Sequence, residues 1–211
     1  MRLAAFAIAA SFAGVACAGP MGYNGSTMAM GDFGRNWAEA WVNHAVTPRD
    51  AFGAGYTWMR SDDDRVIHRV AEATYTRLVH RWNMPHAQAN AWFVVGAGVM
   101  TGNDFEGERF AWTPGFQLDY ETTRVYVAAM GRLYRAGSIA NDYAAVRAGF
   151  SFYEAEYEQV QPWFLVEARH MRAMSERVEV TPMVRFISSR YFVEAGVNLE
   201  GQARFNFMYI F

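Results

Sequence analysis

Apolar and polar residues alternate with a period of two through most of this 211-residue chain. The clearest case is 110–121, where one set of alternate positions holds Phe110, Trp112, Pro114, Phe116, Leu118 and Tyr120. The other set holds Ala111, Thr113, Gly115, Gln117, Asp119 and Glu121. Because successive side chains of a strand point to opposite faces, this pattern predicts strands whose two faces meet different surroundings.

Turn-like breaks separate about ten such segments from residue 51 onward, an even number as in bacterial barrels. We expect strands near 51–61, 66–82, 89–101, 110–121, 124–136, 143–153, 162–174, 177–187, 190–199 and 203–211. Segment 66–82 fits least well, because Arg69, Arg77 and Arg81 disturb either choice of faces, which predicts a β-bulge or a shorter strand there. Eight strands is the alternative if a hairpin is miscounted.

The last nine residues, 203–211, place an aromatic stripe on one face of the predicted final strand. The rings of this stripe belong to Phe205, Phe207, Tyr209 and Phe211. This ending resembles that of Gram-negative outer-membrane β-barrel proteins, whose last strand commonly ends in Phe after alternating aromatic residues. The resemblance covers nine residues and implies a transmembrane barrel in contact with lipid. It also implies that the four rings form the signal recognised by the barrel assembly machinery.

The other end of the chain predicts export. Residues 1–18 combine a positive start at Arg2, a short apolar stretch and an Ala-x-Ala cleavage site around Cys17, as in a secretory signal peptide. The alternative is a lipoprotein that carries its lipid on Cys17, but the preceding residues match a lipobox poorly. Cys17 is the single cysteine, so cleavage after Ala18 leaves no thiol in the mature protein.

Composition agrees with an outer-membrane location. Aromatic residues make up 16% of the chain, which suits the girdles at membrane interfaces, and no charge-free apolar run is long enough for a membrane helix. The formal net charge of −2 points away from nucleic acid as a partner. A soluble β-sandwich or lipocalin-like barrel is the competing fold, and it would turn its apolar face inward.

The polar face of the predicted strands carries both signs of charge, as expected of a lumen that neutralises itself. We expect the inward network to contain Asp119, Glu121, Arg132, Arg147, Glu167, Arg169, Glu179, Arg185, Glu194 and Arg204. These charges would either hold a closed lumen together or line a narrow, ion-selective pore. The small bore of a ten-strand barrel favours the structural role.

Residues 19–50 precede the predicted barrel and begin with a Met-rich stretch. Residues 35–46 predict a short helix, because Trp37, Ala40, Trp41 and His44 share one helical side. We expect this segment to be a periplasmic tether whose Trp side rests on the membrane interface or barrel rim. A plug inside the lumen is the alternative.

Candidate chemistry is sparse. Both termini are expected in the periplasm, which places loops such as 61–65 and 101–109 outside the cell. An acid of the first outer loop (Asp62, Asp63 or Asp64) or of the second (Asp104 or Glu106) could pair with His170 in a membrane-embedded protease- or lipase-like enzyme. No catalytic signature surrounds these residues. The sequence therefore predicts a small structural, surface or narrow-pore barrel with no catalytic residues and no cofactor.

Metal binding is the remaining possibility. Thioether and imidazole groups suit copper, and the candidate ligands are Met21, Met28, Met30, His44 and His86. Methionine also fills irregular space in cores and lipid-facing surfaces, so the pattern alone assigns no metal.

Overall fold

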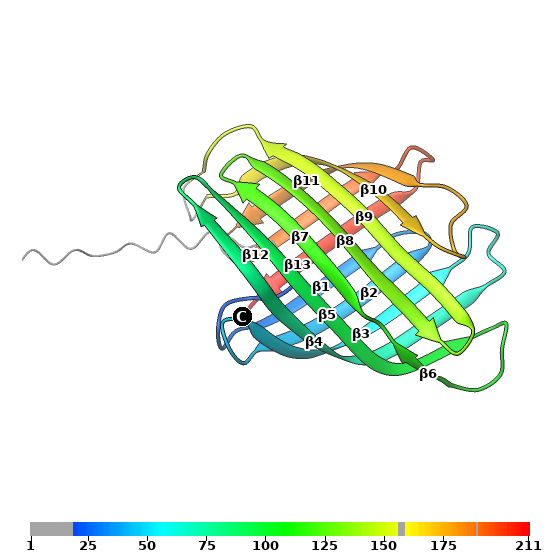
Figure 1. Ribbon diagram of the computed structural model, residues 1–211. Coiled ribbons are helices and arrows are strands. Elements are labelled where there is room, and N and C mark those ends of the chain that lie inside the picture. Colours follow the sequence, from blue (N-terminus) through cyan, green and yellow to red (C-terminus); the bar gives the residue numbers. More distant parts are fainter. Residues whose placement is uncertain (1–18, 156–158, 189) are drawn as a thin grey trace, which may run out of the picture.

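Apart from one interrupted strand, each described strand pairs with its neighbours in sequence, and the first pairs with the last, so the sheet closes into an antiparallel barrel (Figure 1). The computed structural model describes residues 19–155, 159–188 and 190–211. The predicted signal peptide, 1–18, lies outside the described residues. Within the described ranges there is no helix, and hence none long and apolar enough to cross a membrane.

The first half of the wall contains β1 (Thr27–Phe33), β2 (Trp37–Ala45), β3 (Asp50–Arg60), β4 (Ile67–Met84), β5 (Ala87–Gly102) and β6 (Arg109–Trp112). The second half contains β7 (Gly115–Thr122), β8 (Val125–Ala136), β9 (Ile139–Ser151), β10 (Gln161–Met171), β11 (Glu179–Ser188), β12 (Tyr191–Val197) and β13 (Ala203–Ile210). Segments β6 and β7 both lie between β5 and β8 and form one wall strand, interrupted at Thr113-Pro114. The described barrel therefore has twelve strands.

All ten predicted strands are present, but the predicted totals of ten and eight are wrong. The two extra strands, β1 and β2, lie in the segment expected to precede the barrel. The helix expected over 35–46 is absent, because β2 occupies that range. In β2 the inward side carries Trp37, Glu39, Trp41 and Asn43, and the outward side begins with Ala38. Tryptophans four residues apart share a face in a helix and in a strand, so their spacing does not distinguish the two.

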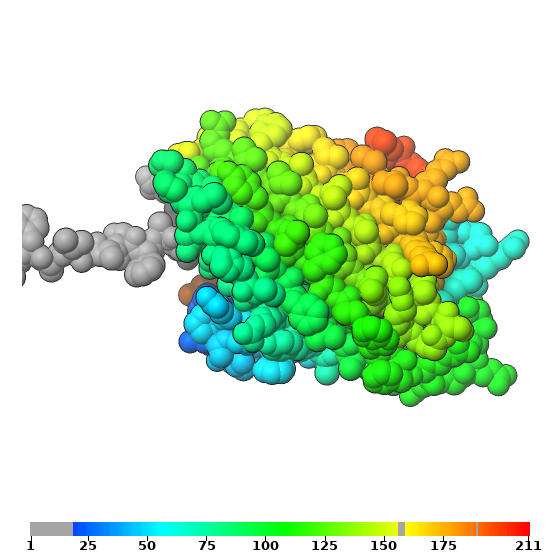
Figure 2. Space-filling view, in the orientation of Figure 1, coloured from blue at the N-terminus to red at the C-terminus, as the bar shows by residue number. Residues whose placement is uncertain are grey.

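The faces of the wall are reversed relative to a soluble barrel. Large apolar side chains point outward, such as Phe110 at 69% and Phe116 at 52% exposed, whereas Glu194 and Arg204 point inward at 0% and 2%. Figure 2 shows one outer face, where side chains from β5 to β9 form a continuous surface. This arrangement excludes the soluble alternatives, because those folds bury their apolar face.

The irregular charges of the fourth strand are explained by a bulge. The register of β4 against β5 shifts between Leu78 and His80, which confirms the predicted β-bulge. Arg69 and Arg77 point outward before the bulge, and Arg77 pairs with Asp50 at 3.0 Å. After the bulge the alternation is reset, so Arg81 lies beside inward-facing Asn90 and donates to it at 2.7 Å.

The two ends of the barrel differ. One end, the terminal end, holds the start of the described chain and Phe211, where the Thr27 N–H donates to the Phe211 carbonyl at 2.9 Å (Figure 1). The opposite end, the loop end, carries the connections 34–36, 61–66, 103–108, 137–138, 172–178 and 198–202.

A buried apolar layer fills the lumen at the loop end. It consists of Trp37, Met59, Val70, Met100, Ala111, Tyr134, Ala136, Met171 and Met174. Met174 comes from loop 172–178, so one of the loop-end connections contributes a side chain to this layer. Charged side chains occupy the lumen beside and below the layer, and smaller apolar clusters lie towards the terminal end.

Candidate functional site in the barrel lumen

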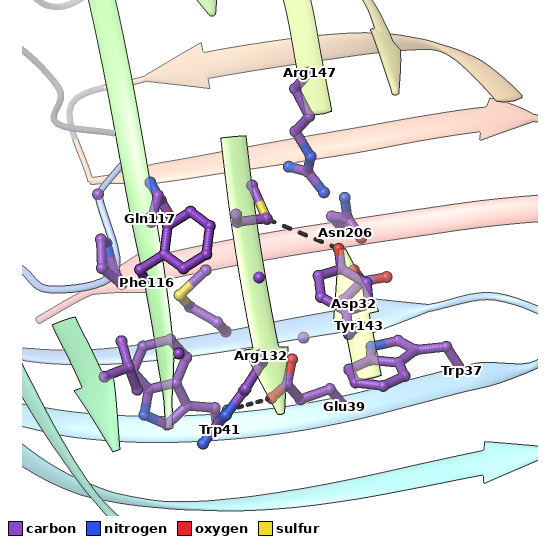
Figure 3. A pocket seen from close by; sticks show the side chains of 18 of the residues that line it. Asp32, Trp37, Glu39, Trp41, Phe116, Gln117, Arg132, Tyr143, Arg147 and Asn206 are labelled. Atoms are coloured by element: carbon purple, nitrogen blue, oxygen red, sulfur yellow. Dashed lines mark hydrogen bonds and ion pairs between the residues drawn. The ribbon is translucent and has the colours of Figure 1, made fainter. Parts of the chain in front are cut away.

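An ion-pair cluster spans the bore. Arg132 on β8 places its Nη1 atom 3.2 Å from Glu39 Oε1 on β2 and its Nη2 atom 2.7 Å from Glu72 Oε1 on β4. Four wall strands separate β2 from β8 on the shorter way round, so the Arg132–Glu39 pair crosses the lumen (Figure 3). The Thr113 hydroxyl donates to Glu72, and Gly96 leaves the space that this carboxylate occupies. We call these three charged residues the crossing cluster.

A second cluster joins strands on the other side of the lumen. Arg147 lies 2.5 Å from Glu167 and 3.4 Å from Glu194. Arg204 bonds Glu167 at 3.0 Å and Asp32 at 3.1 Å. These contacts tie β9, β10, β12, β13 and β1 together, and each buried arginine has a carboxylate that offsets its desolvation.

Arg185 extends this second cluster with aromatic contacts. Its guanidinium pairs with Glu194 and lies 4.7 Å from the ring centre of Tyr126 and 5.1 Å from that of Phe192. Cation–π contacts of this kind are strongest when desolvated, and Arg185 is 2% exposed. A separate inward pair joins Arg169 to Glu179 at 2.5 Å.

Salt bridges confirm the predicted network of charges in the lumen, although not every predicted member joins it. Asp119 lies apart from the arginines and accepts hydrogen bonds from Asn90 at 2.6 Å and Trp92 at 2.8 Å. Glu121 follows it on the same inward side of β7. Sequence reasoning missed three carboxylates, Asp32, Glu39 and Glu72, which hold Arg204 and Arg132. Two of them lie in β1 and β2, which were not recognised as strands.

A cavity of about 150 Å³ lies beside the two clusters. Its lining includes Asp32, Trp37, Glu39, Trp41, Tyr126, Tyr143 and Asn206 (Figure 3). The Trp37 ring stacks on Tyr143 with centres 5.1 Å apart. The expected resting place of the tryptophans on the membrane interface is therefore wrong, because both line the lumen.

The start of the described chain enters the terminal end of the barrel. Gly19 and Pro20 line the cavity, and the Pro20 carbonyl accepts a hydrogen bond from Asn43 at 2.8 Å. Met21 packs beside Leu78 and Trp92. Segment 19–50 was expected to form a tether or a plug. Only its first few residues fill part of the bore, and most of its other residues form strands of the wall.

Two loops meet across the loop end. The Asp62 N–H donates to the Met174 carbonyl at 2.9 Å, and the Asp62 carboxylate accepts from the Glu176 N–H at 2.8 Å. These two loops lie on opposite sides of the barrel wall, so the bonds between them span the opening of the barrel above the apolar layer. We call them the mouth contact. In the same loop, the Ser61 hydroxyl donates to Asp63 and lowers the pKa of that carboxyl.

The structure does not assemble the suggested protease-like pair. His170 lies on the outward side of β10, whereas Asp104 bonds His68 Nε2 at 2.8 Å. Asn141 contacts the other ring nitrogen of His68 at 2.6 Å. The histidine that Asp104 contacts is therefore His68 and not His170.

The suggested copper ligands are also dispersed. Met28 packs in an apolar cluster with Phe192 and Met208, against which Met30 also packs, but Met21 lies in a different cluster. Met30 lines the cavity, His86 lies in the β4–β5 turn, and His44 contacts Thr27 on the outer face. In the described ranges no three His, Cys, Asp or Glu residues are grouped to hold a metal ion.

No protein-family model and no curated protein sequence matches this chain. Among solved structures it resembles the KdgM porin in complex with disordered oligogalacturonate, with a TM-score of 0.50 at 12% identity over 87% of this chain and 98% of that chain. A second KdgM porin structure gives a TM-score of 0.49 at the same identity and coverage. OmpT, an outer membrane protein of Vibrio cholerae, gives 0.36 at 9% identity over 89% and 98% of the two chains.

At these identities the likeness shows the fold alone. The closed antiparallel wall, its apolar exterior and its charged interior agree with that fold. The chain has the fold of an outer-membrane β-barrel, and its apolar outer face is suited to contact with membrane lipid.

Proposed function

We propose that the protein is a narrow outer-membrane pore whose bore is closed in this structure. The observation that carries the proposal is the crossing cluster, in which Arg132 bridges nearly opposite walls through Glu39 and Glu72. A bore divided by a side-chain ion pair admits solutes only when that pair separates or moves aside. The mouth contact and the apolar layer add a second barrier at the loop end.

The charges of the bore support a preference for cations. Carboxylates outnumber guanidinium groups on the inward side of the described wall. The acids are Asp32, Glu39, Glu72, Asp119, Glu121, Glu167, Glu179 and Glu194, and the arginines are Arg81, Arg109, Arg132, Arg147, Arg169, Arg185 and Arg204. Rings of acidic side chains favour cations in a pore, so potassium should pass more readily than chloride.

The proposal is tested in planar lipid bilayers. Folded wild-type protein should give small, infrequent openings, with a reversal potential in a KCl gradient that shows cation preference. The triple variant E39Q/E72Q/R132Q replaces the crossing cluster with neutral side chains and should open more often. Both proteins are first checked for the heat-modifiable migration of a folded barrel. Silent bilayers with both folded proteins would overturn the proposal.

Two further assays use the same preparations. Liposome swelling with oligogalacturonate, the ligand in the KdgM porin complex, tests whether the bore of this protein excludes a chain of sugars. Protease and lipase assays test the competing enzymatic role. An enzyme should turn over its substrate in one of these assays and give no conductance in planar bilayers.

A further inference from the structure

We propose that the lumen cavity binds one uncharged, polyhydroxylated six-membered ring, the size and chemistry of a neutral monosaccharide. The inference rests on the proposed pore only for the route by which the ligand reaches the cavity. It is carried by four properties of the cavity: unpartnered polar atoms, aromatic walls, paired charges and size.

Polar atoms without a protein partner point to a polar occupant. Trp37 Nε1 and Trp41 Nε1 are buried donors, and Asn206 Oδ1 is a buried acceptor, and each has no hydrogen-bond partner among the described residues. All three side chains line the cavity, and Trp37 and Asn206 are only 2% and 4% exposed. Buried donors and acceptors in native proteins are nearly always satisfied by protein, water or ligand. A molecule with several hydroxyl groups can satisfy both kinds.

Aromatic walls provide the second argument. Trp37 and Trp41 lie on one side of the cavity with Glu39 between them on β2, and Tyr126 and Tyr143 contribute further rings (Figure 3). The face of an aromatic ring carries partial negative charge and attracts C–H groups. A sugar ring presents C–H groups on its faces and hydroxyls on its rim, which matches walls of rings with polar atoms between them.

The charges of the lining argue against a charged ligand. Glu39 is paired with Arg132, Asp32 with Arg204, and Arg147 with Glu167. A ligand carboxylate or ammonium would have to separate one of these buried pairs and leave a like charge uncompensated. Hydroxyl groups can donate to the carboxylates and accept from the guanidinium groups without breaking a pair.

The volume limits the ligand to a single ring. The cavity measures about 150 Å³, and a cavity of roughly this volume accommodates a six-membered ring such as benzene. A disaccharide has two rings, and we expect its second ring to exceed this volume. The site therefore predicts discrimination by both charge and length.

The test is isothermal titration calorimetry on the full mature protein in detergent. The neutral probes are D-glucose, D-galactose and D-mannose, and the comparison probes are D-glucuronate, D-glucosamine and maltose. At least one neutral monosaccharide should bind saturably with one site. The charged sugars and maltose should bind at least about tenfold more weakly, since each loses or breaks a buried polar interaction.

Matched tryptophan variants locate the site. W41F removes the indole N–H that lines the cavity and should weaken binding about tenfold. W58F is the control, because Trp58 points to the outer face, in register with Arg69 and Ala38, and its variant should bind as wild type does. Each titration is repeated with the variant D62A, which removes a bond of the mouth contact, so that slow access does not hide binding.

The outcomes separate the site from the pore. Saturable, neutral-selective binding with silent bilayers would support the site and overturn the proposed pore. Conductance without saturable binding of any neutral probe to wild type or D62A would overturn the site and show that the cavity holds water only. Equal loss of binding in W41F and W58F, or equal affinity for neutral and charged sugars, would also overturn it.

Discussion

Arg132 Nη1 on β8 lies 3.2 Å from Glu39 Oε1 on β2, across the lumen from one wall to the other. The same guanidinium reaches Glu72 on β4 at 2.7 Å, so one arginine connects three strands that are not neighbours. The backbone hydrogen bonds of the wall, by contrast, join only adjacent strands among the described residues. This cluster therefore couples the shape of the wall to the state of the bore.

The variant R132M should be strongly destabilised. Removing the guanidinium leaves Glu39 and Glu72 buried without their counter-ion, and breaking a buried pair in this way costs about 3–5 kcal/mol. Urea unfolding of the barrel in phospholipid vesicles measures the loss. The triple variant R132M/E39Q/E72Q should recover much of it, because no buried carboxylate then lacks a partner.

The matched control for that experiment is R135M. Arg135 lies three positions along the same strand but points outward, where it pairs with the partly exposed Asp142. Such surface pairs contribute about 0–1 kcal/mol. A loss in R132M no larger than that in R135M would contradict a structural role for the crossing cluster.

The mouth contact should limit opening. D62A removes the carboxylate that accepts from the Glu176 N–H and from the Asn36 amide, each bond being worth about 0.5–1.5 kcal/mol. Its open probability in planar bilayers should rise by up to about tenfold. D63A is the control in the same loop, because Asp63 bonds only within that loop, to Ser61 and Arg65. Equal open probability of D62A and D63A would exclude the mouth contact as a barrier.

The outer face should not tolerate charge. Val184 is 47% exposed and points outward, opposite Phe164 and Ala195 on the neighbouring strands. V184R should cost about 2–4 kcal/mol if the residue lies near the bilayer midplane. E179Q should be milder, because Gln can still accept a hydrogen bond from Arg169.

Both a lipid-facing and a core valine would resist arginine, so a spin label at position 184 distinguishes them. In lipid the label should be accessible to oxygen and protected from a water-soluble nickel reagent. Protection from both reagents would place Val184 in a core and contradict the lipid-facing orientation.

The wall from β3 onward was predictable because each strand keeps its two faces chemically distinct. In β7, for example, Phe116 and Leu118 alternate with Gln117 and Asp119, and the structure places these pairs outward and inward. The partners of Arg147 were also predictable, since Glu167 lies directly opposite it on the adjacent strand. Register between neighbours follows from alternation and short turns.

The crossing cluster was not predictable, for two physical reasons. The outward side of β2 carries Ala38 and Ala40, which give a weak apolar signal, while Trp37 and Trp41 satisfy a helical period equally well. Without β1 and β2 the barrel lacks Glu39 altogether. Contacts across a bore also depend on the total strand number, which sets which walls face each other.

The loop end should face outside the cell and the terminal end the periplasm. E106C, in the exposed loop 103–108, should react with a membrane-impermeant maleimide in intact cells. Position 106 is preferred to Asn103, because the Asn103 side chain bonds Arg65 and Ile67. H86C, in the β4–β5 turn at the terminal end, should react only after lysis. The reverse labelling pattern would invert the orientation.

The final prediction concerns Phe211, whose ring is 57% exposed beside Tyr209, with centres 5.7 Å apart. Its backbone also closes the β1–β13 seam through bonds in both directions to Thr27 at 2.9 Å. F211S keeps these backbone bonds and removes only the ring, so protein refolded in detergent should be nearly as stable as wild type. In cells, F211S should insert poorly and leave protease-sensitive material in the periplasm, because the assembly signal implied by the aromatic ending is incomplete.

F52S is the matched control: Phe52 is 58% exposed on the outer face near the same end, but in β3. An equal defect in F52S would assign the effect to loss of an interfacial anchor rather than to recognition of the last strand. Normal, heat-modifiable F211S in the outer membrane would contradict any role of this ring in assembly.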